Sequence, residues 1–390
     1  MKKIKVCHFA DHLNGKVDGV FKHILSIVKN TDASLFEHYL CFQGNEYIER
    51  KFIAANGKII LLPSITSKYP VHSLIIFYKL MKEYEVDIIH CHFLKPYIVA
   101  GFCNIILKKK VIYNYHGLFI DHHFYNVYEK TLYRLSHYII NKLNAVQLAL
   151  TPSQASKSML IKETSLFPAI TSYYNGGEIK IGADDDEEFI MPYSQFTNFF
   201  SIVFVGRIEE QKRIDTAVRI IKHLADDSVD VKLFIIGGGS EEAKIKSLIH
   251  NLELDDKIIF LGVIDNPSKC FRYFDLLLLT SDYEGMPFVI WEAMSKGLPI
   301  VSSAVEGIVE VVQATECGLL FEKNDISAAV SAIKRIIENP ELKKKLGENG
   351  KSAINCKYNV NNFGIEMHKI YSQLSNDINP SDLSDTIYGA

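Results

Sequence analysis

The chain has 390 residues, which fits two or three domains at the usual size of roughly 100–200 residues each. Apolar residues make up 48% and charged residues 23%, with a net charge of -3, so disordered, collagen-like and coiled-coil classes are excluded. The seven cysteines form no CxxC pair, and we therefore expect neither a disulfide framework nor a structural zinc site. The N-terminus lacks the apolar core of a signal peptide, and no run of about 18 uncharged apolar residues occurs. We predict a cytoplasmic protein, soluble or attached peripherally to the cytoplasmic membrane.

The charge is distributed unevenly along the chain. The first 180 residues hold 22 Lys and Arg against 13 Asp and Glu, whereas the remainder holds 21 against 33. Eleven of the 14 histidines also lie in the first part. A basic half can face phosphate, nucleic acid or an anionic membrane, although a chance division of solvated faces also explains it.

Strand-like and helix-like stretches alternate through the first half. An apolar run at 4–9 precedes a glycine-containing loop and a helical pattern at 20–28, which is the repeating unit of a parallel α/β sheet. Stretches 86–90 and 111–113 are rich in β-branched residues, as buried parallel strands are. Strands are predicted at 4–9, 38–42, 58–62, 87–90, 111–115 and 146–151.

The pattern breaks after residue 171. Asn175-Gly176-Gly177 is a turn signal and 184–188 is a run of five acids, for which a solvated loop is favoured over a DxD metal site. A second α/β series predicts strands at 201–205, 232–236, 257–261, 276–280 and 299–302, and helices at 214–224, 241–252, 326–338, 340–349 and 361–374.

The predicted fold class is α/β, with two Rossmann-like, doubly wound parallel-sheet domains facing each other across a cleft. Ligands of such sheets bind beyond the carboxyl ends of the strands. The predicted parts are an acceptor-side domain at 1–180, a linker at 181–198, a donor domain at 199–356, a helix at 357–376 that crosses back to the first domain, and a loose tail at 377–390.

Two carboxylates stand near a predicted helix start in TSDYEGMPFVIWEAMS (280–295). Pro287 suits the first turn of a helix and Gly297 its C-terminus, so free N–H groups at the start form an anion site. Glu284 lies in the preceding loop and Glu292 inside the helix, and carboxylates accept hydrogen bonds from sugar or ribose hydroxyls. A capping Glu and a surface Glu are the alternative.

Two cations follow the predicted strand that ends at Val205. Arg207 and Lys212 lie at its carboxyl end, where a guanidinium fork and an ammonium point charge suit a diphosphate. The alternative is a salt bridge from either cation to Glu209 or Glu210.

Together these motifs resemble the retaining glycosyltransferases of family 4, also called glycosyl transferases group 1, which have the GT-B fold. The resemblance covers 202–374 and more weakly 4–175. It rests on VGRIEEQK (205–212), FIIGGGS (234–240), FLGVI (260–264), SDYEGMPFVIWEAMSKGLPIVSS (281–303) and CGLLFEKND (317–325). The spacing of Glu284 and Glu292, with the flanking Pro and Gly–Leu–Pro, is typical of the family.

The resemblance implies roles for these residues. Arg207 and Lys212 would hold the donor diphosphate, Glu292 the ribose hydroxyls, and Glu284 the transferred sugar. Ile264 would lie near the base. Backbone N–H groups at Gly285, Met286, Phe288 and Val289 would meet the donor.

The resemblance also assigns residues in the first half. His116, in YNYHG (113–117), would lie at the reaction centre, and Gly19 would let the backbone approach the donor or acceptor. His90 and His92 are interpreted as packing or supporting residues, although the pair could also mimic a metal site. Asp18 replaces a family glycine and is predicted to cap a helix.

The sequence departs from the family pattern at two further places. Residues 305–310, VEGIVE, differ from the family's usual Gly–Gly and Pro–Glu pattern, and we expect a local loop change there. Arg213 replaces the Gly that often follows the Lys, and is expected to be structural.

The implied activity is transfer of a sugar from a nucleotide-diphosphate sugar, a UDP-sugar above others, to a hydroxyl of a glycan or lipid-linked acceptor. The reaction would retain the anomeric configuration, need no metal or other cofactor, and serve synthesis of a surface polysaccharide such as capsule or lipopolysaccharide. No nucleic-acid partner is expected. The aromatic and basic stretch 119–143 suits contact with the inner face of the membrane, or a core helix with a polar edge.

Three other classes remain open. A dinucleotide-dependent oxidoreductase is disfavoured because GGGS at 237–240 lacks the third glycine of the fingerprint. A nucleotide-sugar epimerase on the same fold would work without an acceptor. A non-catalytic nucleotide-sugar-binding subunit would not need all of Arg207, Lys212, Glu284 and Glu292.

Overall fold

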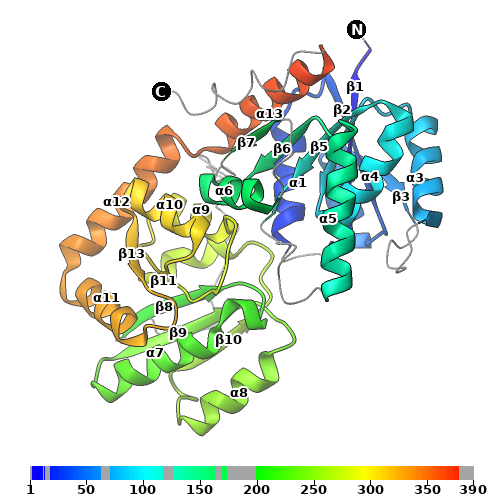
Figure 1. The fold of residues 1–390 in the computed structure, drawn as a ribbon. Coiled ribbons are helices and arrows are strands. Elements are labelled where there is room, and N and C mark those ends of the chain that lie inside the picture. The colour runs from blue at the N-terminus through cyan, green and yellow to red at the C-terminus, as the bar shows by residue number, and fades with distance from the viewer. Residues whose placement is uncertain are drawn as a thin grey trace. The chain divides into compact units, whose positions relative to one another are not determined.

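The computed structural model describes residues 2–11, 13, 18–62, 71–116, 126–163, 169–173 and 199–376. The chain forms two units, Met1–Asn175 together with Asn361–Ala390, and Gly176–Val360 (Figure 1). The predicted turn at 175–177, the linker at 181–198 and the tail at 377–390 lie outside the described residues. Within the described part of the chain, no helix combines the length and the apolar character needed to cross a bilayer.

The first unit is a seven-stranded sheet in the order β3-β2-β1-β4-β5-β6-β7, and every strand pair in it is parallel. The order reverses between β1 and β4, which is where such sheets bind ligands. The strands are β1 (Ile4–Ala10), β2 (Phe36–Phe42), β3 (Lys58–Leu61), β4 (Ile88–His92), β5 (Lys110–Asn114), β6 (Leu148–Thr151) and β7 (Ile170–Ser172). The helices between them are α1 (Gly19–Asn30), α2 (Glu46–Ala54), α3 (Val71–Glu83), α4 (Leu94–Leu107), α5 (Val127–Lys142) and α6 (Gln154–Glu163).

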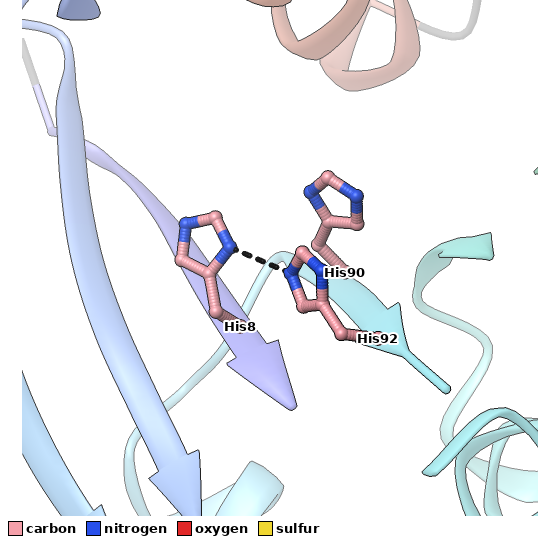
Figure 2. Close-up of side chains that lie close together, drawn as sticks. All are labelled: His8, His90 and His92. Atoms are coloured by element: carbon pink, nitrogen blue, oxygen red, sulfur yellow. Dashed lines mark hydrogen bonds between the residues drawn. The ribbon is translucent and has the colours of Figure 1, made fainter. Parts of the chain in front are cut away.

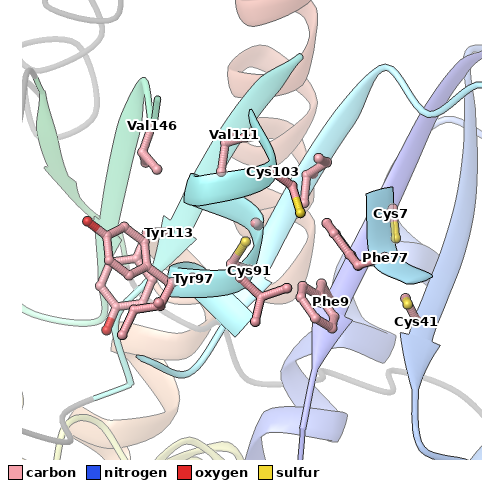
Figure 3. Close-up of a cluster of buried hydrophobic side chains, with 14 of the residues drawn as sticks. Cys7, Phe9, Cys41, Phe77, Cys91, Tyr97, Cys103, Val111, Tyr113 and Val146 are labelled. Atoms are coloured by element: carbon pink, nitrogen blue, oxygen red, sulfur yellow. The ribbon is translucent and has the colours of Figure 1, made fainter. Parts of the chain in front are cut away.

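The two faces of this sheet differ in chemistry because successive side chains of a strand alternate between them. One face is apolar and packs on α3, α4 and α5, with Cys7, Phe9 and Cys91 from the strands against Phe77 and Tyr97 from the helices (Figure 3). The other face begins with apolar residues but carries polar side chains toward the carboxyl ends of the strands. The buried histidines of these strands and Asn114 therefore gather on one face of the sheet.

The last helix, α13 (Val360–Ser375), packs in the first unit. Phe363, Met367, Ile370 and Leu374 are buried there beside the strand residues of the second face. Gly364 lies so close to α1 that an added Cβ would be 2.4 Å from the carbonyl oxygen of Asn30. Helix α13 thus completes the core of the first unit.

The second unit has six strands in the order β10-β9-β8-β11-β12-β13, again all parallel, with the reversal between β8 and β11. The strands are β8 (Phe200–Val205), β9 (Val231–Ile236), β10 (Ile258–Gly262), β11 (Leu276–Leu279), β12 (Ile300–Ser303) and β13 (Gly318–Phe321). The helices are α7 (Ile214–Asp226), α8 (Glu242–Asn251), α9 (Phe288–Lys296), α10 (Glu306–Thr315), α11 (Ile326–Glu338) and α12 (Pro340–Cys356). The two doubly wound sheets confirm the predicted fold class.

The structure corrects several predicted elements. Strands β7 and β13 were not predicted, and the strand expected at 87–90 extends to His92. The segment expected as an altered loop at 305–310 is mostly helix α10. Pro287 is the N-cap residue of α9 instead of a member of its first turn, because its ψ of 132° is extended. Gly297 ends α9 with a φ of 71°, as predicted.

The packing of α13 predicts a contrast between two isoleucines on the same helix. Ile370→Ala removes a fully buried side chain and is expected to cost about 2–5 kcal/mol in unfolding free energy. Ile365→Ala, at a side chain 54% exposed, is the matched control and should cost less than about 1 kcal/mol. Urea unfolding followed by circular dichroism measures both, and equal losses would contradict the packing described.

Candidate functional site

In the second unit, the loops after β8 and β11 meet at the carboxyl edge of the sheet. These two strands are neighbours at the point where the strand order reverses. The loop after β8 carries Arg207 and Lys212, and the loop after β11 carries Glu284. The topology therefore brings together the two motifs that the sequence separates by about seventy residues.

Lys212 and Glu284 form a nearly buried ion pair. The Lys212 Nζ lies 2.5 Å from Oε1 of Glu284, and the two side chains are only 12% and 9% exposed. Ser281 Oγ donates to the same carboxylate oxygen at 2.7 Å. Burial, and then the charge of Glu284, raise the pKa of Tyr283 to about 12. A cation and a carboxylate are thus held together at the predicted donor site.

Hydrogen bonds to backbone carbonyls join the same two loops. The Asp282 N–H donates to the Gln211 carbonyl at 2.9 Å, and the Gln211 amide donates to the Tyr283 carbonyl at 2.8 Å. Thr280 Oγ1 donates to the Lys212 carbonyl at 2.9 Å. These bonds fix the spacing between the loops without using the ion pair.

The two arginines of the first loop have different partners. Arg207 is exposed and pairs with Glu209 at 2.9 Å, which is the alternative weighed for it above. Arg213 has a left-handed φ of 47° and pairs with Asp215 at 3.0 Å and Asp282 at 3.2 Å. Arg213 therefore joins the two loops, in line with the structural role expected for it.

Helix α9 begins at the same edge with no side-chain cap on its N-terminus. The first N–H groups of an uncapped helix are available to an anion. The next helix, α10, also starts without a side-chain cap and approaches closely, since a Cβ on Gly307 would lie 1.5 Å from the Gly285 carbonyl oxygen. Only glycine fits at position 307, so α10 supports the loop that precedes α9.

The other residues predicted for the donor site lie around this edge. Gly285 and buried Met286 precede α9, Phe288 and Val289 are its first two residues, and partly exposed Glu292 is its fifth. Ile264 lies beyond β10 and is partly exposed. All belong to the second unit, whereas Gly19 is the exposed first residue of α1 in the first unit. Asp18 caps α1 as predicted, accepting from the N–H groups of Val20 and Phe21.

In the first unit, histidines line one face of the sheet at its carboxyl edge. His8 on β1 is the register partner of His90 on β4, and His92 is the partner of Asn114 on β5. His116 is the second residue after β5 and is partly exposed, while the other three histidines are fully buried. Figure 2 shows His8, His90 and His92, with the rings of His8 and His92 joined by a hydrogen bond.

Three of these histidines and His38 on β2 form a hydrogen-bonded series that we call the histidine chain: His38, His8, His92 and His116. The Nδ1 of His38 lies 3.1 Å from the Nε2 of His8, whose Nδ1 is 3.2 Å from the Nε2 of His92. The Nδ1 of His92 is 3.1 Å from the Nε2 of His116. At the inner end, Thr31 Oγ1 lies 2.8 Å from the Nε2 of His38.

A second set of polar side chains flanks the histidine chain. The Nδ1 of His90 lies 2.8 Å from the hydroxyl of Tyr371 on α13. The amide of Asn114 lies between the two rings, 3.4 Å from the Nε2 of His90 and 2.9 Å from the Nε2 of His116. His23 on α1 packs edge-on against the ring of His116 at 5.3 Å. The ring of His116 is thereby held from three elements.

Burial keeps these imidazoles neutral. It lowers the pKa of His38 to about 4, and it lowers the pKa of His8, His92 and His116 well below 6.5. Neighbouring histidines lower the pKa of the last three further, because two imidazolium charges so close would repel each other.

Two groups of three histidines also have ring nitrogens within 4.8 Å of one another. They are His8 with His90 and His92, and His23 with His92 and His116. Neutral imidazole is a common ligand of zinc and other transition metals. However, His92 is shared by both groups and already uses both nitrogens in the histidine chain, so each group would have to break that chain to bind an ion.

Sequence reasoning missed several members of both arrangements. Ser281 and Gln211 were not singled out, although they hold Glu284 and the facing loop. His8, His23, His38 and Thr31 were missed because they come from separate elements. The signal available was the two-residue spacing of His90 and His92 in a strand, which places both on one face.

Models of two families match the chain. The model described as Glycosyltransferase Family 4 matches residues 17–176, and the model described as Glycosyl transferases group 1 matches residues 185–353. The two parallel-sheet units have the GT-B fold. Together the two models span most of the chain, which belongs to these glycosyltransferase families, family 4 in its first half and group 1 in its second, and the predicted resemblance is confirmed.

Curated relatives are similar over different lengths. N-acetyl-alpha-D-glucosaminyl L-malate synthase of Bacillus anthracis is 28% identical over 45% of this chain and 46% of its own length. The capsular polysaccharide biosynthesis glycosyltransferase CapM of Staphylococcus aureus is 25% identical over 44% and 46%. The chain thus spans about half the length of these two relatives. An uncharacterized glycosyltransferase of Methanocaldococcus jannaschii is 26% identical over 96% of this chain and 100% of its own length.

Solved structures share the fold. HepE of Anabaena in complex with UDP superposes with a TM-score of 0.77 at 18% identity, over 95% of this chain and 100% of that one. A glycosyltransferase from Rickettsia africae superposes with a TM-score of 0.79 at 17% identity, over 97% and 100%. At these identities the likeness concerns the fold alone.

The Lys212–Glu284 pair predicts strong energetic coupling. Lys212→Met or Glu284→Gln alone leaves a nearly buried polar group without its partner, and each is expected to cost about 3–5 kcal/mol in unfolding free energy. The double variant should cost less than the sum, with a coupling energy of about 1–3 kcal/mol in a double-mutant cycle. The surface pair Lys244–Glu241 is the control and should show no measurable coupling. Additive losses at 212 and 284 would contradict the contact.

The neutral histidines predict a stability that depends on pH. The lowered pKa values make the unfolded state bind more protons, so the stabilisation is complete above about pH 6.5 and is lost as the pH falls toward 4. His38 alone accounts for about 3 kcal/mol over this range. Urea unfolding between pH 8 and 4.5 measures the loss, which His38→Asn should reduce and His72→Asn, at an exposed position of α3, should not. An unfolding free energy independent of pH would contradict neutral burial.

Proposed function

We propose that this protein transfers a sugar, with retention of anomeric configuration, from a UDP-sugar to a hydroxyl of a glycan or lipid-linked acceptor in surface-polysaccharide synthesis. The observation that carries the proposal is the Lys212–Glu284 pair beside the uncapped start of α9. Family membership supports a glycosyl transfer, and complexes of the Anabaena protein with UDP and UDP-glucose support the choice of nucleotide.

The donor diphosphate would be held by cations and a helix start. Arg207 and Lys212 would exchange their carboxylate partners for phosphate oxygens, and the N–H groups of Phe288 and Val289 would complete the anion site. Glu284, released from Lys212, would then accept from a hydroxyl of the transferred sugar. Glu292, one turn further along α9, would accept from the ribose hydroxyls.

Charge development on the leaving diphosphate is the barrier to be lowered. The cations and the helix start stabilise that charge as the sugar becomes oxocarbenium-like. In the proposed retaining route the acceptor hydroxyl arrives on the face from which the diphosphate leaves, and the diphosphate takes its proton. Glu284 therefore positions the sugar and is not a nucleophile. His116 would hold a hydroxyl at the reaction centre through a ring nitrogen.

The acceptor is proposed from the surface of α5 and from relatives. Tyr128, Leu132, Leu135 and Tyr138 follow one another at helical spacing and are between 44% and 72% exposed. Basic side chains of the same helix accompany them, and Lys142 lies over the ring of Tyr138 at 5.4 Å. An exposed apolar stripe with basic neighbours suits an anionic membrane surface and hence a lipid-linked acceptor on its cytoplasmic side. The name of the S. aureus relative supports polysaccharide synthesis.

The reaction is proposed to need no metal. Cations of the chain itself, Arg207 and Lys212, are available for the diphosphate, so no divalent ion has to supply that charge.

The test is donor hydrolysis by the purified chain. The protein is incubated with UDP-, GDP- and ADP-sugars in the presence of excess EDTA, and the nucleoside diphosphate released is measured. We expect release from one UDP-sugar, a fall of about 100-fold or more for Glu284→Ala, and little change for Glu322→Ala, an exposed Glu of the same unit. Proton spectra recorded during hydrolysis should show the released sugar first in the donor's anomeric form.

Other results would contradict individual parts of the proposed function. Isomerised donor without hydrolysis indicates an epimerase, and binding without turnover in the presence of lipid-linked acceptors indicates a non-catalytic subunit. Activity abolished by EDTA and restored by a divalent ion overturns the metal-free route. Normal turnover by Glu284→Ala overturns the role given to Glu284.

A further inference from the structure

The histidine chain has a direction that is set at its buried end. Thr31, the residue that ends α1, has one hydroxyl hydrogen and two contacts, the Ile27 carbonyl oxygen at 2.8 Å and the Nε2 of His38 at 2.8 Å. A carbonyl oxygen can only accept, so the hydroxyl must donate to Ile27. The remaining contact is then satisfied only if His38 donates its Nε2–H to the Thr31 oxygen.

One choice of tautomer then determines the next. A neutral imidazole carries one N–H, so His38 with a protonated Nε2 offers its Nδ1 as an acceptor. The Nε2 of His8 must donate to it, the Nε2 of His92 must donate to the Nδ1 of His8, and the Nε2 of His116 must donate to the Nδ1 of His92. All four rings take the same tautomer, and the last one keeps a lone pair on Nδ1, whose hydrogen-bond contact among the described residues is the Asn114 amide nitrogen at 3.4 Å.

The flanking residues are compatible with this direction. In the structure the amide nitrogen of Asn114 faces the Nε2 of His116 and its oxygen faces the Nε2 of His90. A half-turn of the amide reverses this: its oxygen then shares the Nε2–H of His116 with the Nδ1 of His92, and its NH₂ group donates to the Nε2 of His90. His90 in turn donates its Nδ1–H to the hydroxyl of Tyr371. The two ends of an amide exchange places by a half-turn, whereas the carbonyl of Ile27 has no such freedom. The Thr31 end therefore decides the direction.

We propose that Thr31, acting through His38, His8 and His92, is a positioning residue that holds His116 in the tautomer with Nε2 protonated and Nδ1 free to accept a hydrogen bond. The protonated Nε2 is occupied inside the protein, so Nδ1 is the nitrogen available to a substrate hydroxyl. The consequence for catalysis rests on the proposed function, in which His116 holds a hydroxyl at the reaction centre. The tautomer itself does not depend on that function.

The reversed direction explains why the anchor matters. If Thr31 did not accept, each ring could instead protonate Nδ1, and His116 would present an N–H where a substrate hydroxyl needs an acceptor. Hydrogen bonds linked in series adopt one direction together, so a change at Thr31 alters the tautomer of His116 four contacts away. A residue at the end of α1 thereby sets which atom of His116 can accept.

The experiment reads the tautomer directly. Long-range proton–nitrogen NMR spectra of the full-length protein, labelled with ¹⁵N-histidine, distinguish protonated from unprotonated ring nitrogens, and the signals of His116 are identified by their loss in His116→Gln. In the wild type we expect a protonated Nε2 and an unprotonated Nδ1 at His116. Thr31→Val, which removes the acceptor oxygen at nearly constant size, should yield a mixture of both tautomers at His116.

Control variants separate this effect from loss of structure. Thr31→Ser keeps the hydroxyl and should keep the wild-type tautomer. Thr171→Val removes a buried hydroxyl on β7 that is not part of the histidine chain, and it should leave the tautomer of His116 unchanged. His8→Leu interrupts the histidine chain midway and should also yield a mixture of tautomers at His116. It provides a second test if Thr31→Val does not fold. A wild-type His116 protonated on Nδ1, or a tautomer that is the same after both breaks, overturns the proposal.

Kinetics extend the test where the donor assay succeeds. The kcat of Thr31→Val should fall by the fraction of His116 that has lost the Nε2–H form, with the KM for the donor changed less than about twofold, since the diphosphate site is untouched. A parallel rise in KM with unchanged kcat would contradict a positioning role. Should the wild type turn over no donor, the proposed function fails while the spectra still decide the tautomer.

Discussion

In each unit the order of the strands reverses at one point in the sheet, and this reversal determines where the polar side chains of the candidate sites lie. Between β1 and β4, and again between β8 and β11, the connecting segments depart to opposite sides and leave the carboxyl edge open. The histidine chain lies at the first reversal and the Lys212–Glu284 pair at the second. Apolar residues elsewhere in the strands make the two cores, so polar groups are confined to the edge where they have partners.

The two reversal points solve the burial of polar groups in different ways. In the second unit, opposite charges neutralise each other, and serine and backbone groups satisfy what remains. In the first unit, the charges are absent because burial and mutual repulsion keep the imidazoles neutral, and each ring satisfies the next. An ion pair can be exchanged for a charged ligand, whereas a neutral series holds its geometry. The ion pair of the second unit suits binding of a diphosphate, and the neutral histidines of the first unit suit a fixed hydrogen-bond acceptor.

Sequence patterns predicted the fold well where strands are long and apolar. The runs that became β1, β8 and β9 were found within one residue or so because β-branched and aromatic residues fill them. The short strands β7 and β13, with three and four residues, carry too little periodicity to stand out, and ITS and GLLF also fit loops. The motif around Glu284 and Glu292 was predictable because its residues are contiguous. The histidine chain was not, because Thr31, His38 and His8 meet only through the strand register, which single-sequence patterns do not supply.

The ion pair also explains how a site can be stable and still open to its ligand. Lys212 and Glu284 stabilise each other when no donor is bound, and Gln211, Thr280 and Arg213 hold the two loops together independently of them. A diphosphate that takes Lys212 therefore leaves the loops in place and frees a carboxylate within a few ångströms of the phosphate. In the proposed function Ser281 still donates to the freed Glu284 carboxylate, and a hydroxyl of the transferred sugar would replace the lost ammonium, which would favour the complete nucleotide sugar over the nucleoside diphosphate. In this proposal, discrimination between substrate and product would follow from the Lys212–Glu284 contact.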